Sequence, residues 1–302
     1  MKKLSITFIA LMGMTFMGKA QQQVPALAKV RYSFSHVRDT LNRAQPYQEQ
    51  MVLLIGKNAS LFTSYDKIQQ LNKLNEVLYQ QAVANGGNIT NVDMRQMKRR
   101  PVTYTDFYTF FDTKKAFVVE IMMMSKYCYE DSISTIKWQL SKDTATISGI
   151  ACKKATAHFK GRNWIAWYDP ALPFQSGPWK LNGLPGLIMT AYDERKDIQF
   201  EFAGFDKIEA EPQQEKPKTF MLGGSRVESE QLYLNTIRLP TNAIKATKDE
   251  VMRLRNVQMT NPEALINSQT GGTTNVRRVS GQSTAPPKRN ILNNPMELPE
   301  QQ

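Results

Sequence analysis

The sequence predicts a mainly β protein. We expect a β-rich α+β fold with a curved antiparallel sheet or half-barrel, one amphipathic helix packed on it, and a disordered C-terminal tail. Between about residues 102 and 206, short runs rich in aromatic and β-branched residues alternate with polar turns, and no spacing matches a βαβ unit. Consecutive strands joined by short turns pair as antiparallel neighbours, so we expect a meander that bends into a single sheet.

The first strands are expected at 28–38 and 49–55. Val30, Tyr32, Phe34 and His36 alternate with polar residues, which is the period-two pattern of a strand with one buried face. The turn-prone segment 42–46 separates the two runs.

An amphipathic helix is expected over 65–84, followed by a basic loop to 101, and together they form an insertion in the domain. Thr63, Ser64 and Asp66 are available as N-caps, and the Asn-Gly-Gly-Asn segment 85–88 is a strong stop. An apolar stripe at three- and four-residue steps predicts that one side of the helix is buried. Its members are Ile68, Leu71, Leu74, Val77 and Leu78.

The predicted meander consists of the runs 102–111, 115–129, 134–140, 144–159, 164–168, 187–192 and 197–205. The clearest turns between them are 141–143, 160–163 and 193–196. A further strand within 219–238 and a short helix over 247–259, with Val251 and Leu254 inward, complete a single domain at 21–260. All four tryptophans lie in or between these runs, where aromatic area normally builds core: Trp138, Trp164, Trp167 and Trp179.

Residues 1–20 have the pattern of a secretory signal peptide. Lys2 and Lys3 precede an apolar run over 4–17, and Ala20 ends a small-residue cleavage site. That run is too short to span a bilayer, and no later run reaches 18 apolar residues, so no transmembrane segment is expected in the mature chain. The chain is therefore expected to be exported, either periplasmic, outer-membrane associated or secreted, with cleavage near Ala20.

Residues 261–302 are rich in Gly, Ser, Thr, Asn, Pro and Gln, so they are predicted to form a disordered polar tail. The net charge of +12 falls to 12 − 3 = +9 when Lys2, Lys3 and Lys19 leave with the signal peptide. An exported chain rarely meets nucleic acid, so this charge favours an anionic envelope surface or a protein partner, and no nucleic acid. A diffuse charge without a partner is the alternative.

The mature chain has two cysteines, Cys128 and Cys152. In an oxidising compartment such a pair favours one disulfide, which would contribute about 3 kcal/mol through loop closure. Two buried thiols that pack as small hydrophobic groups are the alternative.

A Gly- and Pro-rich string precedes the predicted strand at 187–192. Residues 183–188 spell Gly-Leu-Pro-Gly-Leu-Ile, and Gly177-Pro178-Trp179 lies just before them. With its flanks at 147–155, 161–162 and 166–168, the stretch from about 138 to 193 resembles the GLPGLI family, exported bacterial proteins of unknown function. The resemblance implies an exported protein, and it implies no activity, cofactor or site residue.

Leu184-Pro185-Gly186-Leu187 matches a type II turn, with Pro at the second position and Gly at the third. Two interpretations of the string stay open: it forms a tight corner against the sheet, or its loop forms the rim of a binding groove. The candidate rim residues are Gly177, Pro178, Trp179, Gly183, Leu184, Pro185, Gly186, Leu187 and Ile188.

No catalytic residue, metal site or cofactor is predicted. His36 and His158 stand apart from other ligand-type residues, and Met122-Met123-Met124 is better explained by strand packing than by Cu(I) binding. No G-x-S-x-G, P-loop or dinucleotide-binding fingerprint occurs in the sequence.

Three functional hypotheses follow. The first is a non-enzymatic envelope protein that binds an apolar or lipidic ligand between the sheet and the helix, an arrangement similar at fold level to the half-barrel of periplasmic lipoprotein carriers. The second is a structural or interaction protein of the cell envelope that docks on an anionic surface or a protein partner. The third is a hydrolase of unrecognised type.

Overall fold

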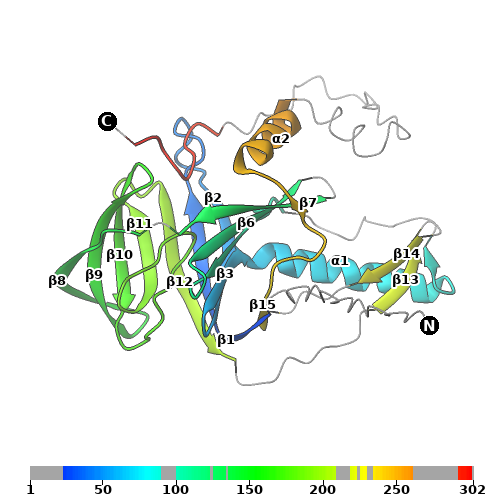
Figure 1. The fold of residues 1–302 in the computed structure, drawn as a ribbon, viewed down its shortest axis with the longest axis horizontal. Helices are drawn as coiled ribbons and strands as arrows, with labels where there is room; N and C mark the ends of the chain where they lie inside the picture. Colours follow the sequence, from blue (N-terminus) through cyan, green and yellow to red (C-terminus); the bar gives the residue numbers. More distant parts are fainter. Residues whose placement is uncertain are drawn as a thin grey trace, which may run out of the picture.

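The computed structural model describes residues 23–89, 100–122, 125–133, 135–208, 218–222, 225–229, 234–260 and 292–300. As predicted, the fold is mainly β, with a large, curved, open sheet and two helices (Figure 1). In this part of the chain, no helix is both long enough and apolar enough to cross a membrane. The predicted signal peptide at 1–20 lies outside the described residues.

The strands are β1 (Val24–His36), β2 (Tyr47–Gly56), β3 (Ala59–Ser64), β4 (Asn88–Ile89), β5 (Thr105–Phe110), β6 (Lys115–Met122), β7 (Ser125–Ser132), β8 (Gln139–Ile147), β9 (Ile150–Phe159), β10 (Arg162–Asp169), β11 (Leu187–Asp193), β12 (Ile198–Lys207), β13 (Lys218–Leu222), β14 (Ser225–Ser229), β15 (Thr236–Ile237) and β16 (Ile244–Lys245). The helices are α1 (Tyr65–Ala84) and α2 (Lys248–Thr260).

The order of strands in the large sheet is β16-β7-β6-β5-β3-β2-β1-β12-β11-β10-β9-β8, and β15 pairs with β1. The prediction of one continuous meander over 102–206 is therefore wrong. The three N-terminal strands lie in the middle, because β1 pairs with β12 on one side and β3 pairs with β5 on the other. Strand β3 and most of β2 are buried on both faces, whereas β1 alternates between buried and less buried residues, so β2 and β3 need cover on both sides.

The central strands separate two hydrophobic clusters. On β2, Met51, Leu53 and Ile55 face one cluster, whereas Val52 and Leu54 face the other. The first cluster also contains Tyr32 of β1 and much of β9–β12. Alternate residues of a strand point to opposite faces, so a strand that is apolar throughout must be covered on both.

Several turns were misplaced in the sequence-based prediction. The run 115–129 is split into β6 and β7, which pair as an antiparallel hairpin with Met122 opposite Ser125. The run 144–159 is split at Ser148-Gly149, where both residues have positive φ (49° and 83°). The predicted turn at 141–143 is instead a register shift inside β8. The predicted turns at 160–163 and 193–196 are confirmed, and Lys196 N donates to Asp193 O at the second of them (2.7 Å).

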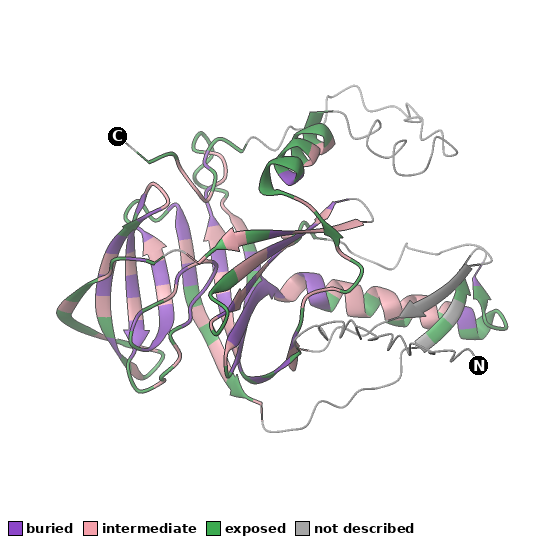
Figure 2. Cartoon of the chain, in the orientation of Figure 1, coloured by how far each residue is buried: buried purple, intermediate pink, exposed green. Residues whose placement is uncertain are grey.

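Helix α1 occupies the predicted residues, and Ser64 is its N-cap, accepting a hydrogen bond from Lys67 N (2.8 Å). Only its first turn packs on the large sheet, through Ile68 in the second cluster. Figure 1 shows the rest of α1 extending away from the sheet towards β13 and β14, and Figure 2 shows that much of it is exposed or half-buried. The small sheet beside its C-terminal half has the order β14-β13-β4.

Helix α2 begins with a capping box. Glu250 N donates to Thr247 Oγ1 (3.2 Å), and Thr247 N donates to Glu250 Oε2 (2.7 Å). The predicted inward residues are confirmed, since Val251 is fully buried and Leu254 packs beside it against β6 and β7.

Residues 292–300, the C-terminal segment, lie against β1 and the β9–β10 turn, and Asn294 is buried. The prediction of disorder from 261 onward is therefore wrong for these residues. The other tail residues, 261–291 and 301–302, lie outside the described part of the chain.

Cys128 and Cys152 are both free thiols, so the candidate disulfide between them is wrong. Cys128 lies on β7 and Cys152 on β9, and eight other strands lie between these two in the sheet. The two side chains also belong to different hydrophobic clusters. The alternative interpretation, two thiols that pack as small hydrophobic groups, fits this arrangement.

Candidate functional site

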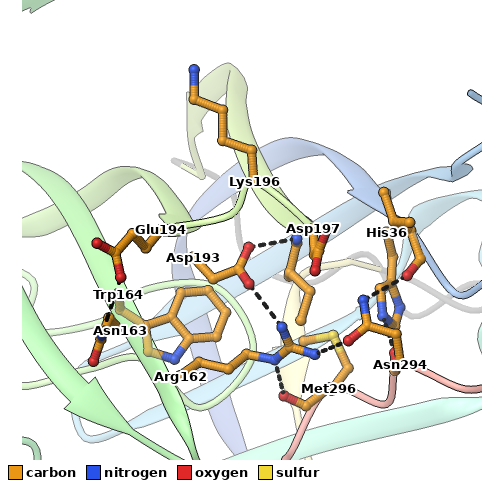
Figure 3. A network of polar contacts seen from close by, with 12 residues as sticks. His36, Arg162, Asn163, Trp164, Asp193, Glu194, Lys196, Asp197, Asn294 and Met296 are labelled. Atoms are coloured by element: carbon orange, nitrogen blue, oxygen red, sulfur yellow. Dashed lines mark hydrogen bonds and ion pairs between the residues drawn. The ribbon is translucent and has the colours of Figure 1, made fainter. Parts of the chain in front are cut away.

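A buried polar cluster lies where the β9–β10 turn meets the C-terminal end of β1 (Figure 3). At its centre is Arg162, the first residue of β10, which is 4% exposed. Its Nη1 donates to Asp193 Oδ2 (2.7 Å), and Asp193 Oδ1 accepts from Ile198 N (2.8 Å). The carboxylate at the end of β11 therefore neutralises the guanidinium and sets its orientation.

Two further nitrogens of Arg162, Nη2 and Nε, donate to three successive residues of the C-terminal segment. Nη2 donates to Asn294 Oδ1 (2.7 Å) and to Pro295 O (2.5 Å). Nε donates to Met296 O (3.0 Å), and Figure 3 shows the guanidinium between Asp193 on one side and Asn294 and Met296 on the other. One side chain of the sheet thus binds two main-chain carbonyls and one side-chain carbonyl of a distant segment.

Asn294 has a partner for each of its polar groups. Nδ2 donates to Val37 O (2.8 Å), and the main-chain N donates to Arg38 O (3.2 Å). Its carbonyl O lies 2.8 Å from His36 Nε2. Burial lowers the pKa of His36 to about 4, so the ring is neutral at pH 7, and Nε2 carries the proton because a carbonyl only accepts.

An acidic residue of the segment contacts lysines from three separate elements. Glu297 Oε1 accepts from Lys180 Nζ (2.7 Å), and Glu297 Oε2 lies 3.8 Å from Lys160 Nζ and 4.0 Å from Lys248 Nζ. Lys180 also donates to Asp131 (2.6 Å). Burial lowers the pKa of Lys180, but hydrogen bonds to the two carboxylates outweigh burial and raise the pKa overall.

The end of the segment follows the β9–β10 turn closely. Leu298 N donates to Lys160 O (3.0 Å), and a Cβ on Gly161 would lie 2.6 Å from Leu298 O. Gly161 also has a φ of +69°, so this turn requires glycine for two reasons. Glu300 accepts from Gly161 N (3.1 Å) and from His158 Nε2 (2.8 Å). Hydrogen bonds to Asn163 and Glu300 raise the pKa of His158.

The Gly-Leu-Pro-Gly-Leu-Ile string lies at the entrance to β11, and most of its apolar side chains are core. Leu184, Leu187 and Ile188 are fully buried, and Tyr32 OH donates to Ile188 O (2.6 Å). Gly183 and Pro185 are exposed. The corner interpretation explains these positions, and the interpretation as a groove rim stays a prediction.

The loop before the string places Trp179 in the first hydrophobic cluster. Its φ is +55°, an uncommon conformation for a side-chain-bearing residue, and its indole packs on Trp164 with ring centroids 5.6 Å apart. Gly177 and Pro178 are buried beside it. Because Lys180 follows Trp179 directly, this corner also positions the ammonium group that binds Glu297.

The predicted type II turn at 184–187 is wrong. Gly186 N donates to Leu184 O (2.8 Å), which closes a three-residue γ-turn around Pro185. Leu187 N donates instead to Leu172 O (3.0 Å). Gly186 has a φ of +153°, and a Cβ there would collide with Asp169 O. Close approach of two backbones, rather than a four-residue turn, requires this glycine.

A second polar cluster has a spacing that sequence analysis missed. Ser64 and Lys67 stand in the Ser-x-x-Lys arrangement that some acyl-transfer enzymes place at a helix start. Ser64 is fully buried, caps α1 and donates to Glu49, while Lys67 Nζ pairs with Asp106 (2.5 Å). Each group has a structural role and the hydroxyl is inaccessible, so we assign no catalysis to it.

The described residues contain no group of three or more His, Cys, Asp or Glu side chains placed to hold a metal ion. His36 and His158 lie on different strands, and both form hydrogen bonds with the C-terminal segment. The sequence-based analysis missed Arg162, Asp193 and Asn294 as a site. The sequence signal for this site is weak, because its residues are an arginine at the start of a strand, an aspartate at a turn and an asparagine in a polar tail.

No family model and no curated protein matches the chain. Solved structures similar to it include PNGF-II in two crystal forms. The P21 form has a TM-score of 0.43 and 16% identity, covering 65% of this chain and 30% of its own. The C2 form has a TM-score of 0.42 and 15% identity, covering 65% of this chain and 29% of its own. The similarity spans less than a third of those chains and carries no argument about this one.

Proposed function

We propose that this chain is an exported, non-enzymatic interaction protein of the cell envelope that binds an extended peptide segment of a protein partner. The binding site is the polar cluster in which residues 292–300 lie. One observation carries the proposal: Arg162, buried and oriented by Asp193, donates to the main-chain carbonyls of Pro295 and Met296 and to the side-chain carbonyl of Asn294. A guanidinium with several carbonyl partners is an arrangement for holding a peptide backbone.

The chemical character of the site supports peptide binding. Residues 292–300 are joined to the sheet mainly by hydrogen bonds and ion pairs, with the Met296 side chain packed on the first hydrophobic cluster. The acidic side chains Glu297 and Glu300 lie on basic partners, which is charge complementarity between segment and site. An exchangeable peptide interface has this mixture, whereas a permanent core contact is dominated by apolar area.

The lipid-binding hypothesis receives less support. It requires the helix at 65–84 to cover the sheet, and only the first turn of α1 packs there. Docking on an anionic surface rests on the mature charge of +9. Several of the tail cations that would serve it, including Arg277, Arg278, Lys288 and Arg289, lie outside the described residues. Because the described contacts of residues 292–300 suit a peptide, we place a protein partner first.

Export and family membership are part of the same proposal. The pattern of residues 1–20 supports export, and the string at 183–188 with its flanks supports membership of the GLPGLI family. Cell fractionation and N-terminal sequencing test the export step. The expected mature protein begins at Gln21 in an envelope or extracellular fraction, and an uncleaved chain in the cytoplasm would contradict it.

Peptide binding is tested with the full chain carrying Asn294→Ala, which weakens the bound segment and leaves the site intact. A fluorescent peptide of residues 292–300 is titrated into this variant and followed by anisotropy. We expect saturable binding, weakened by the added site substitution Lys180→Gln and unaffected by Lys154→Gln, which removes an exposed pair with Asp143 on β8–β9. Absence of saturable binding up to millimolar peptide would overturn the proposal.

A further inference from the structure

We infer that the site selects extended peptides in which asparagine is followed by proline, an apolar residue and an acidic residue, and that the partner is a protein presenting such a segment. This inference rests on the proposed function. Residues 294–297, Asn-Pro-Met-Glu, are the copy of this pattern that the chain itself carries. Each of the four positions meets a different chemical environment.

The first position requires asparagine. Arg162 donates to the side-chain oxygen of Asn294, and Val37 O accepts from its side-chain nitrogen. An aspartate would place a second oxygen against the Val37 carbonyl, with no donor between them. An apolar residue would leave both groups unpaired, and a glutamine would be one methylene too long for a residue that is 5% exposed.

The second position favours proline for a different reason. Arg162 Nη2 donates to the carbonyl of Pro295, whose ring is exposed. Proline restricts φ before binding. A peptide already held extended loses less conformational freedom when it binds.

The third and fourth positions add an apolar contact and a charge. The Met296 side chain packs on the first hydrophobic cluster beside the sheet. The next residue, Glu297, meets Lys180, Lys160 and Lys248. Three cations around one partly exposed carboxylate favour an acidic residue without requiring it, because solvent screens such pairs.

The segment and its site are also separated in sequence. Residues 261–291 lie between the end of α2 and the segment, so the site is filled by a part of the chain that is distant in sequence. A segment of the same chain binds its site intramolecularly, so a partner must bind more tightly or through an additional contact to displace it. Residues 292–300 of the chain therefore compete with any partner, and peptides of low affinity do not displace them.

The experiment compares nine-residue peptides in competition with the fluorescent 292–300 peptide on the full chain carrying Asn294→Ala. Peptides with Asn294→Asp or Asn294→Gln are expected to bind roughly 10- to 100-fold more weakly, as for a lost buried hydrogen bond. A peptide with Glu297→Gln should lose about 2- to 5-fold, and this loss should shrink at high salt.

The outcomes separate the inference from the proposed function. If the original peptide and the Asn294→Asp peptide bind equally, the inferred pattern is wrong while peptide binding stands. If no peptide binds, both fail. Should Asn294→Ala unfold the chain by circular dichroism, the chain carrying Glu297→Gln and Glu300→Gln serves instead, because both carboxylates are partly or fully exposed. Unmodified full chain should bind the same peptides more weakly, since its own segment competes.

Discussion

Arg162 Nη2 donates to Asn294 Oδ1 over 2.7 Å, and this hydrogen bond joins residues 132 positions apart. Both residues are buried, with exposures of 4% and 5%. Arg162 Nη1 also donates to Asp193, and Asn294 Nδ2 donates to Val37 O, so each side chain has a further partner beyond this contact. The position of the C-terminal segment therefore depends in part on two side chains whose contact is not indicated by any short-range sequence pattern.

A double-mutant cycle tests the energy of this contact. We expect Asn294→Ala to lower the free energy of unfolding by about 1–3 kcal/mol, because Arg162 and Val37 each lose a buried partner. Arg162→Lys should lower it by about 2–4 kcal/mol, since lysine cannot reproduce the fork of donors. Urea unfolding of the double variant should show a loss at least ~1 kcal/mol smaller than the sum.

The control for that cycle pairs Asn294→Ala with Lys115→Gln. Lys115 forms an exposed ion pair with Glu130 on β6–β7, away from the segment. These two substitutions should be additive within about 0.5 kcal/mol. Additivity of the Arg162 and Asn294 substitutions as well would contradict a direct contact.

Gly161→Ala tests how closely the segment approaches the β9–β10 turn. Its Cβ would lie 2.6 Å from Leu298 O, and its φ is +69°. Gly149→Ala in the β8–β9 turn is a matched control, because its φ is +83° and nothing lies within 4 Å of its Cβ. We expect about 1–2 kcal/mol from backbone strain in both variants and at least ~1 kcal/mol more for Gly161→Ala. Equal losses in thermal unfolding would mean that the segment does not contact the turn.

The pH dependence of stability tests the burial of His36. Burial lowers its pKa from 6.5 to about 4, so between these values the unfolded chain binds a proton that the folded chain does not. Stability is therefore fully present above pH 6.5 and falls as the pH falls towards 4, by about 3 kcal/mol in total. His36→Gln keeps an N–H donor and removes the titration.

The measurement is the free energy of unfolding at several pH values between 7 and 4, for both proteins. His36→Gln should have the shallower slope over this window. His158 has a raised pKa, so its contribution is lost as the pH rises above 6.5 and does not produce the same fall. Parallel profiles for the two proteins would exclude His36 as the source.

Much of the local structure could be predicted from sequence, because its signals are local. Helix α1 coincides with the predicted 65–84, where an apolar stripe, the Ser64 cap and the Asn-Gly-Gly stop all agree. The arrangement of strands could not be predicted in the same way. The position of β1 between β2 and β12 depends on pairs such as Phe34 opposite Phe200, which short turns do not specify.

The site was missed for a related reason. Composition predicts disorder for a segment with few apolar residues, and most of 261–302 fits that description. Asn294 is buried only because Arg162, His36 and Val37 provide partners for it. The composition of the tail does not predict this burial, although Met296 and Leu298 are two apolar residues close together within it.

Gly186→Ala tests the corner at the entrance to β11. A Cβ at Gly186 would collide with the backbone of Asp169, which cannot move without displacing β10. Gly183→Ala is the matched control in the same loop, with a φ of +85° and nothing within 4 Å. We expect Gly186→Ala to cost at least ~3 kcal/mol and Gly183→Ala about 1–2 kcal/mol. Similar midpoints in urea would show that the loop adjusts freely.

Thiol counting tests the state of the cysteines. Alkylation of the unfolded, unreduced chain should add two groups, since Cys128 and Cys152 are both free. In the folded chain Cys152 should react slowly, because it is 1% exposed and burial raises the pKa of its thiol to about 11. Adducts that appear only after reduction would establish a disulfide and contradict the structure.

The central place of β1 has a consequence for how the polypeptide is made. Its second partner strand, β12, begins at Ile198, far downstream of His36. At about 5–20 residues per second, translation delivers that partner roughly 8–30 s later. Until then one edge of β1 is unpaired and Tyr32 and Phe34 are uncovered, so the middle of the sheet is completed only after β12 has been made.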